Sequence, residues 1–211
     1  MEGNSNLIAE VTGVVLAGGR SRRMGRDKAA LPIDGVPLLQ WVVTRLQRAL
    51  ADVIVIGPRE AQSLAPTTRV IPDATPGAGP LAALATALAA ITTPYAFVVA
   101  CDMPCVQPAL IRAQAQIALM EAAQVVALRT LESDKPGLEP LHAVYARACL
   151  PEIEAQLAVG EPGMRYLLAR LQVREIKPDE RARYDPQGIS TLNVNTPDEW
   201  ARALDICQPM S

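Results

Sequence analysis

Basic side chains gather beside two adjacent glycines near the start of this sequence. Residues 18–28 read GGRSRRMGRDK, with five cations and a single acid. Glycines such as Gly18 and Gly19 allow positive φ and close approach of the backbone to a ligand, so that amide N–H groups can point at a phosphate. The segment therefore predicts a phosphate-binding loop, and the alternative is a solvated basic turn. The five cations are Arg20, Arg22, Arg23, Arg26 and Lys28.

A single acid follows the most convincing buried run of the chain. Residues 95–100 read YAFVVA and are followed by Cys-Asp-Met-Pro, which places Asp102 just beyond this run. A carboxylate at the tip of a buried strand is costly unless it meets a cation. Magnesium sites use one or two carboxylates together with phosphate oxygens and waters. We therefore expect Asp102 to bind a metal ion, and the alternative is that it caps a helix before Pro104.

Buried parallel strands are the elements that must position these residues. In open α/β sheets ligands lie beyond the carboxyl ends of the strands, so the loop after Leu16 and the acid Asp102 should meet at one edge. The expected strands are 14–16, 53–56, 70–73, 95–100, 124–128 and 138–145. The expected helices are 37–50, one after Pro80, 108–122, 150–159, 164–171 and one from Pro197. This alternation predicts an α/β fold, a three-layer α/β/α sandwich with a mostly parallel, Rossmann-like sheet.

The glycine-rich loop differs from two common nucleotide-binding motifs. In a Walker A loop Ser or Thr follows the lysine, whereas Ala29 follows Lys28 here. The G-x-G-x-x-G pattern does not fit either, because Gly18 and Gly19 are adjacent. These differences argue against a P-loop NTPase and against a Rossmann dehydrogenase.

The longer pattern L-A-G-G-x-S-x-R-M-G-x-D-K, at residues 16–28, resembles the signature of the molybdenum cofactor guanylyltransferases. It is also similar, more broadly, to the nucleotidyltransferases that handle sugar 1-phosphates. The later segments V-I-x-D, G-P-L, C-D-x-P, P-L-x-A-V-Y and N-x-N-T-P resemble the same family, so the resemblance covers nearly all of the chain. It implies the nucleotide-diphospho-sugar transferase type of fold. The LAGG opening is similar to members that transfer guanylyl groups, whereas cytidylyl-transferring relatives tend to read LAAG.

The resemblance implies a role for each matching residue. Lys28 and Arg22 would neutralise phosphate charge at the end of the loop. Asp73 would face the guanine or ribose, unless it merely caps or turns the chain, and Gly79 would let a helix start close to the ligand. Many family members carry an asparagine near the position of Ile56, and this sequence does not. The residues that would bind nucleotide, metal or pterin are Leu16, Ala17, Gly18, Gly19, Lys28, Asp73, Gly79, Asp102, Asn193 and Asn195, the two asparagines on the pterin side.

The reaction implied by the resemblance is attack by the terminal phosphate of molybdopterin on the α-phosphorus of GTP, with release of pyrophosphate. A phosphate monoester is mostly dianionic at neutral pH and needs no general base, which suits a sequence whose single histidine, His142, is expected to be structural. Alignment and charge neutralisation would come from Mg²⁺ on Asp102 together with Lys28 and Arg22.

Two other functions remain open at this stage. One is a cytidylyl or sugar-phosphate nucleotidyltransferase of the same fold, and the other is a non-catalytic carrier of the molybdenum cofactor. GTP and molybdopterin are the expected substrates, and cofactor-delivery proteins and apo-molybdoenzymes are further partners that the family implies.

Composition sets the remaining expectations. Half of the 211 residues are apolar and the net charge is −2, which suits one domain over residues 1–211. The cations are concentrated in one loop, so no nucleic acid partner is expected. The alanine- and leucine-rich stretch 81–91 is too short to cross a membrane, and the first ten residues do not resemble a secretory signal, so we expect a cytoplasmic protein. The cysteines contain no C-x-x-C pair and are expected to be buried, reduced thiols: Cys101, Cys105, Cys149 and Cys207.

Overall fold

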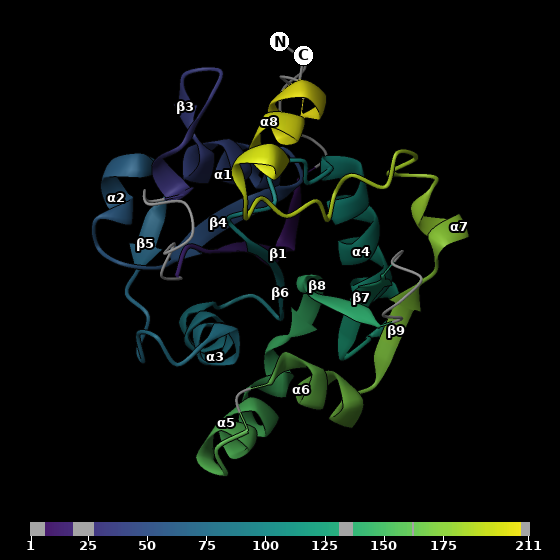
Figure 1. Ribbon diagram of the computed structural model, residues 1–211. Coiled ribbons are helices and arrows are strands. Elements are labelled where there is room, and N and C mark those ends of the chain that lie inside the picture. Colours follow the sequence, from purple (N-terminus) through teal and green to yellow (C-terminus); the bar gives the residue numbers. More distant parts are fainter. Residues whose placement is uncertain (1–6, 19–27, 131–136, 162, 208–211) are drawn as a thin grey trace.

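The computed structural model describes residues 7–18, 28–130, 137–161 and 163–207. Its centre is a seven-stranded sheet with the strand order β5-β4-β1-β6-β8-β7-β9 (Figure 1). The strands are β1 Ile8–Leu16, β4 Leu50–Ile56, β5 Arg69–Ile71, β6 Tyr95–Ala100, β7 Val125–Arg129, β8 Leu138–Ala146 and β9 Val173–Ile176. Neighbouring strands are parallel except at β8, which runs antiparallel to both β6 and β7. The predicted mostly parallel sheet is confirmed.

Alternate side chains of the strands form a buried apolar layer on each face of the sheet. Val15 and Phe97 lie in one cluster, together with side chains of α1 and α4. Val14 and Val98 lie in the other, together with side chains of α3, α5 and α6, which lie below the sheet in Figure 1. Because successive strand residues point to opposite faces, the same strands serve both layers. The predicted three-layer α/β/α sandwich is confirmed. The helices are α1 Leu38–Gln47, α2 Ala61–Leu64, α3 Pro80–Ala90, α4 Pro108–Glu121, α5 Leu150–Ala158, α6 Met164–Arg170, α7 Pro178–Arg181 and α8 Pro197–Ile206.

One boundary difference lies between α1 and β4. The helix was expected over residues 37–50, but Pro37 is its N-cap and it ends at Gln47. Leu50 instead begins β4 and pairs with Ile8 of β1, three residues before the strand was expected. The apolar pattern continues across this boundary and does not mark it, so the pairing of β4 with β1 decides where the strand begins.

The expectation of reduced cysteines is wrong for two of the four. Cys105 and Cys207 form a disulfide that joins the loop before α4 to the residue after α8. Cys149 is buried and Cys101 is half-buried, and both lie outside this disulfide. The partners of the disulfide are 102 residues apart in sequence, so spacing gave no indication of the pair. No helix within the described residues is long and apolar enough to cross a membrane.

Candidate active site

Three parallel strands end side by side and place their last residues at one edge of the sheet. The Ala17 N–H donates to the Ile56 carbonyl at 2.8 Å, and the Cys101 N–H donates to the Leu16 carbonyl at 3.1 Å. These bonds continue the sheet one residue past β1 and β6. The chain that follows β1 and β6 is therefore held at fixed spacing, as expected for the binding edge of an open α/β sheet.

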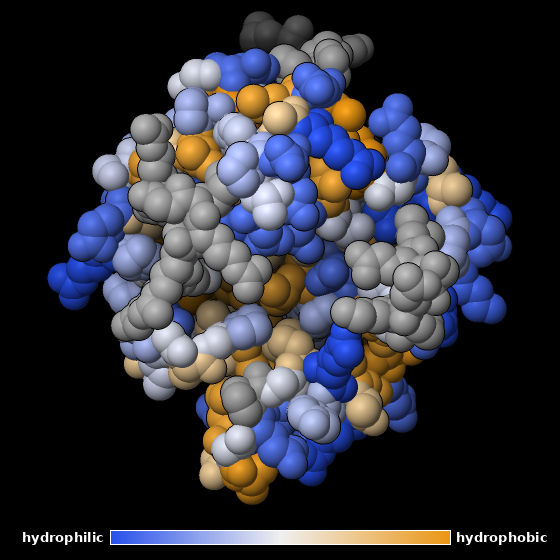
Figure 2. Space-filling view, in the orientation of Figure 1, coloured by the Kyte–Doolittle hydropathy of each residue, from blue (hydrophilic) through white to orange (hydrophobic). Residues whose placement is uncertain are grey.

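A cavity of about 1660 Å³ lies at this edge. Figure 2 shows the recess, with apolar side chains in its depth. Its apolar wall includes Ala61 and Leu64 of α2 and Leu141 of β8. The predicted residues that line it are Leu16, Ala17, Gly18, Asp73, Gly79, Asp102, Asn193 and Asn195. The predicted residues Gly19 and Arg22 lie outside the described part of the chain.

Asp102 and Asn195 in the wall of this cavity both contact Lys28, which is not itself one of the lining residues. The Lys28 ammonium donates to Oδ1 of Asn195 at 2.8 Å and lies 3.7 Å from Oδ2 of Asp102. The side chains of Lys28 and Asp102 are only 13% and 26% exposed, so little water screens the pair. Burial raises the pKa of Asp102 above its ordinary value, although Lys28 acts in the opposite direction. The ionised carboxylate is therefore short of hydration, and a further cation beside it would be favourable.

The segment before α8 is fixed to the loop that carries Asp102. The Val194 N–H donates to the backbone carbonyl of Asp102 at 2.9 Å. Glu199 accepts the N–H groups of Asn195 and Thr196, while Thr196 accepts the N–H of Glu199, so a capping box begins α8. These hydrogen bonds lower the pKa of Glu199, with Asn195 as the largest cause. The backbone around Asn195 is thus held from both sides.

Asp73 has a turn-forming role as well as a place in the cavity wall. Its Oδ1 accepts the Thr75 N–H at 3.0 Å and the Thr86 hydroxyl at 3.4 Å. This is the local side-chain-to-backbone bonding expected of an aspartate in a turn. The structure therefore bears out the turn reading, and contact between Asp73 and a nucleotide stays a prediction.

Gly18 and Gly79 are the glycines of the predicted site that the structure describes, and glycine suits the two positions for different reasons. Gly79 is the N-cap of α3 with φ 97°, a conformation that favours glycine. Gly18 does not adopt the positive φ that glycine allows, and a Cβ at Gly18 would meet no atom within 4 Å. The missing side chain of Gly18 leaves open space in the cavity, and the backbone conformation does not require glycine there.

Comparison with known proteins gives the family. The chain matches the family model of the MobA-like NTP transferase domain over residues 13–176. It belongs to this family. A relative from Chloroflexus aggregans, named as a probable molybdenum cofactor guanylyltransferase, is 36% identical over 194 residues, which are 90% of this chain and 91% of that protein. This chain, like its MobA-like relatives, is a nucleotidyltransferase.

Solved structures agree with this assignment. Molybdopterin-guanine dinucleotide biosynthesis protein A from Archaeoglobus fulgidus is 28% identical, with a TM-score of 0.78 over 93% of this chain and 98% of that one. A protein from Mycobacterium tuberculosis, crystallised in complex with manganese, is 23% identical, with a TM-score of 0.66 over 93% of this chain and 98% of that one. The second similarity shows a shared fold alone.

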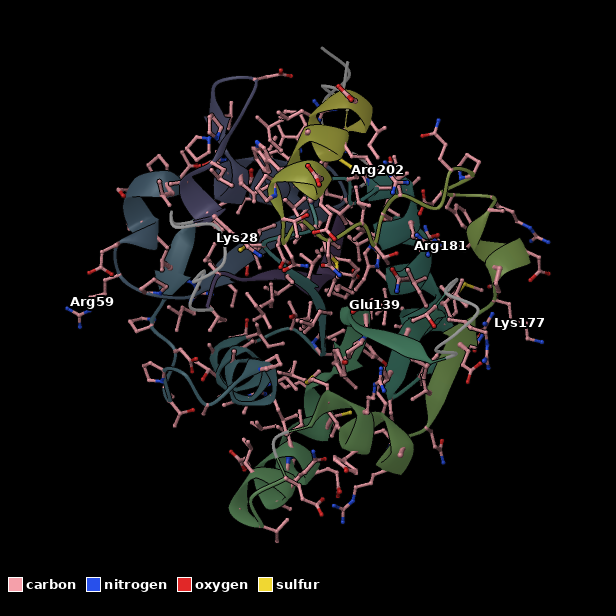
Figure 3. The ribbon with its side chains drawn as sticks, in the orientation of Figure 1. Lys28, Arg59, Glu139, Lys177, Arg181 and Arg202 are labelled. Atoms are coloured by element: carbon pink, nitrogen blue, oxygen red, sulfur yellow. A yellow bond between two sulfur atoms is a disulfide. The ribbon has the colours of Figure 1, made fainter. Side chains whose placement is uncertain are left out.

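Glu139 is a cavity residue that sequence reasoning did not select. It is the second residue of β8 and lines the cavity, and one of its oxygens accepts the Leu141 N–H at 3.0 Å. In Figure 3, Glu139 and Lys28 lie in the interior of the view, whereas Arg59 and Lys177 extend from its rim. Because β8 is antiparallel, its first residues lie where the other strands end. An apolar run does not show strand direction, so the sequence carried no signal for this placement.

His142 has no place in the chemistry of this MobA-like site. Its side chain is fully buried, packs edge-on against Phe97 with ring centroids 5.1 Å apart, and pairs with the Ser190 hydroxyl. Burial lowers the pKa of His142 to about 3, so the ring is neutral at physiological pH. The structural role expected for this residue is confirmed.

The side chains around Asp102 fit a hard divalent cation. Among the described residues no group of three or more His, Cys, Asp and Glu lies close enough to hold a metal without help. Asp102 supplies one carboxylate, and the amide side chains of Asn193 and Asn195 line the same cavity. Oxygen donors of this kind suit magnesium, which is commonly held by one or two carboxylates and completed by phosphate oxygens and waters.

Proposed function

We propose that this protein transfers GMP from GTP to the terminal phosphate of molybdopterin, forming molybdopterin guanine dinucleotide and releasing pyrophosphate. The observation that carries the proposal is the meeting of Lys28, Asp102 and Asn195 at the strand edge of a nucleotidyltransferase fold. Among other proteins, the Chloroflexus aggregans relative supports the proposal through its name.

Lys28 and Asp102 have separate tasks in this proposal. Lys28 places a nearly buried positive charge beside the triphosphate, and Arg22 at the same loop would add a second. Asp102 would hold Mg²⁺, which when bound neutralises charge on the leaving pyrophosphate. The attacking phosphate is largely dianionic at neutral pH, so no side chain has to remove a proton. The absence of an accessible histidine among the described residues is compatible with this chemistry.

The two ends of the cavity would hold the two substrates. The wall formed by residues 16–18 and 79 would face the nucleotide, with Asp73 beside the guanine or ribose. Asn193 and Asn195 would face the pterin. We further infer that residues 1–211 act as one nucleotidyltransferase domain in the cytoplasm, and that the product passes to cofactor-delivery proteins or apo-molybdoenzymes.

The test is transfer by the purified protein with radiolabelled GTP, Mg²⁺ and molybdopterin. We expect pyrophosphate release that requires molybdopterin and a labelled dinucleotide product. CTP and UTP should compete poorly with GTP. Equal use of CTP would contradict the guanylyl assignment, and tight binding of molybdopterin without pyrophosphate release would favour the carrier instead.

A further inference from the structure

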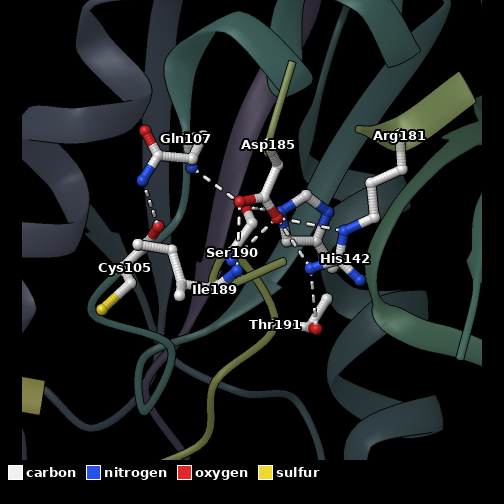
Figure 4. Close-up of polar contacts among 8 residues, drawn as sticks. All are labelled: Cys105, Gln107, His142, Arg181, Asp185, Ile189, Ser190 and Thr191. Carbon is white, nitrogen blue, oxygen red and sulfur yellow. Dashed lines mark hydrogen bonds and ion pairs between the residues drawn. The ribbon is translucent and has the colours of Figure 1, made fainter. Parts of the chain in front are cut away.

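A buried polar network lies beside the cavity and is not part of its wall. Arg181 and Asp185 form an ion pair at 2.7 Å, and their side chains are 3% and 1% exposed. Arg181 donates to Asp185 through both Nε and Nη2, and also to the Thr191 hydroxyl at 3.2 Å. Figure 4 shows these contacts converging with those of Ser190 and His142. A buried ion pair is costly unless its remaining hydrogen-bonding groups are satisfied, so the backbone partners of this pair matter.

Asp185 fixes the turn that leads toward the active site. Its Oδ1 accepts the Ile189 N–H, and its Oδ2 accepts the Ser190 N–H, each at 3.0 Å. The carboxylate thereby holds two successive amides of a segment without regular secondary structure. Ion pairing with Arg181 orients the carboxylate, and charge-assisted hydrogen bonds are stronger than neutral ones.

Ser190 connects this turn to two elements of the main fold. Its hydroxyl oxygen accepts the Gln107 N–H at 2.9 Å and is 2.8 Å from Nε2 of His142. Gln107 is the N-cap of α4, and His142 lies on β8. The Ser190 hydroxyl can donate a hydrogen bond to Nε2 of the neutral His142 ring while its oxygen accepts from Gln107. Ser190 is fully buried, so water does not replace these bonds in the folded protein.

Both sides of the connection lead directly to the active site. Ser190 precedes Asn193 by three residues and Asn195 by five, while Gln107 follows Asp102 by five. A second connection between the same two segments is the bond from the Val194 N–H to the Asp102 carbonyl. The segment with the two asparagines is therefore anchored to the loop of Asp102 at residue 190 and again at residue 194.

We propose that the network of Arg181, Asp185, Ser190 and His142 positions the Asn193–Asn195 segment against Asp102 and Lys28, and thereby sets the affinity for the phosphate acceptor. These are positioning residues, because none of them lines the cavity. The assignment of the acceptor rests on the proposed function, whereas the positioning itself is a property of the fold and can be measured without substrates.

The test variant is Ser190→Ala, which removes the shared hydroxyl and nothing else. Gln156→Ala is a matched control, because Gln156 is also fully buried and holds a loop elsewhere, through the carbonyls of Glu161 and Gly163. Thr191→Val is a milder second variant that removes the Arg181 contact while nearly keeping the side-chain volume. All three are expected to fold with a lowered melting temperature.

The first measurement is hydrogen exchange of the substrate-free protein, followed by mass spectrometry. Ser190→Ala should speed exchange in peptides covering residues 190–195 by about tenfold or more, and Thr191→Val should change the same peptides less. Gln156→Ala should leave these peptides unchanged. Unaltered exchange at residues 190–195 in Ser190→Ala would overturn the positioning role, whether or not the protein transfers GMP.

The second measurement separates the two substrates by steady-state kinetics. In Ser190→Ala, KM for molybdopterin should rise about tenfold, and KM for GTP should rise less, because Lys28 keeps its ion pair with Asp102 when the Asn195 contact loosens. When Asn195→Ala is also present, Ser190→Ala should have little further effect on activity, because Ser190 acts through the position of Asn195. Additive effects, or equal changes in both KM values, would overturn the inference. An inactive unaltered protein would instead contradict the proposed function and leave the exchange result to decide the positioning.

Discussion

Replacing Asp102 with asparagine removes one negative charge from the site at almost constant volume. Oδ2 of Asp102 lies 3.7 Å from the Lys28 ammonium, a separation at which the attraction is roughly 4 kcal/mol for an effective dielectric constant of about 20. The pKa of Asp102 is nevertheless raised, because the loss of hydration on burial outweighs this attraction. Above that raised pKa the ionised group lowers the stability of the folded state. The melting temperature of Asp102→Asn at neutral pH should therefore be unchanged or higher.

Activity should respond in the opposite direction to stability. If Asp102 holds the divalent cation beside the leaving pyrophosphate, its loss affects the chemical step more than nucleotide binding. We expect kcat to fall by at least about a hundredfold, which corresponds to roughly 3 kcal/mol of transition-state stabilisation. A stabilised but inactive protein would separate this effect from damage to the fold.

The assay is continuous pyrophosphate release across a Mg²⁺ titration, with thermal unfolding measured on the same samples. Asp52→Asn is the control, because Asp52 lies near the start of β4, away from the edge where the strands end, and accepts a hydrogen bond from Thr12. It should retain normal turnover. Near-normal pyrophosphate release by Asp102→Asn, with an unchanged Mg²⁺ requirement, would mean that the metal binds elsewhere; the alternative that Asp102 caps a helix is already wrong, because the next helix, α4, begins at Pro108 with Gln107 as its N-cap.

Three further changes test Lys28, Gly18 and the disulfide. Lys28→Ala should weaken GTP binding and slow turnover together; changes within about twofold in both, measured by titration and kinetics, would refute its phosphate role. Gly18→Ala should depress GTP use at an unchanged melting temperature, since a Cβ there meets only open space; normal kcat/KM for GTP would show that no ligand approaches Gly18. Cys207→Ser should lower the free energy of unfolding by about 2–4 kcal/mol without reductant, because the Cys105–Cys207 disulfide closes a long loop. With reductant the variant and the unaltered protein should converge, and equal stability in both conditions would count against the disulfide.

The sequence was most informative about strands and the edge where they end. Apolar runs such as 95–100 indicate buried strands, and β6 has these bounds in the structure. The rule that ligands lie beyond the carboxyl ends of parallel strands then placed Asp102 and the loop after Leu16 together, and both border the same cavity. These predictions succeed because they depend on local hydrophobicity and on a general property of α/β sheets.

Long-range polar contacts could not be predicted in the same way. Lys28 and Asn195 are 167 residues apart, and nothing in either local sequence specifies their bond. Arg181 and Asp185 lie in a polar stretch that composition would assign to solvent, yet their side chains are almost fully buried. Such a pair becomes stable only when backbone amides from residues 189 and 190 are present, so its burial follows from the completed fold and not from either residue.

The position of Asn193 and Asn195 in the chain has a consequence for the order of synthesis. All seven strands of the central sheet have been synthesised once Ile176 has been made, and the family model also ends at that residue. The asparagines, the Ser190 hydroxyl and Cys207 follow only afterwards. The whole sheet is therefore encoded before the residues that close the site, and a fragment ending near residue 176 should fold around its strands but be unable to hold Lys28 in place.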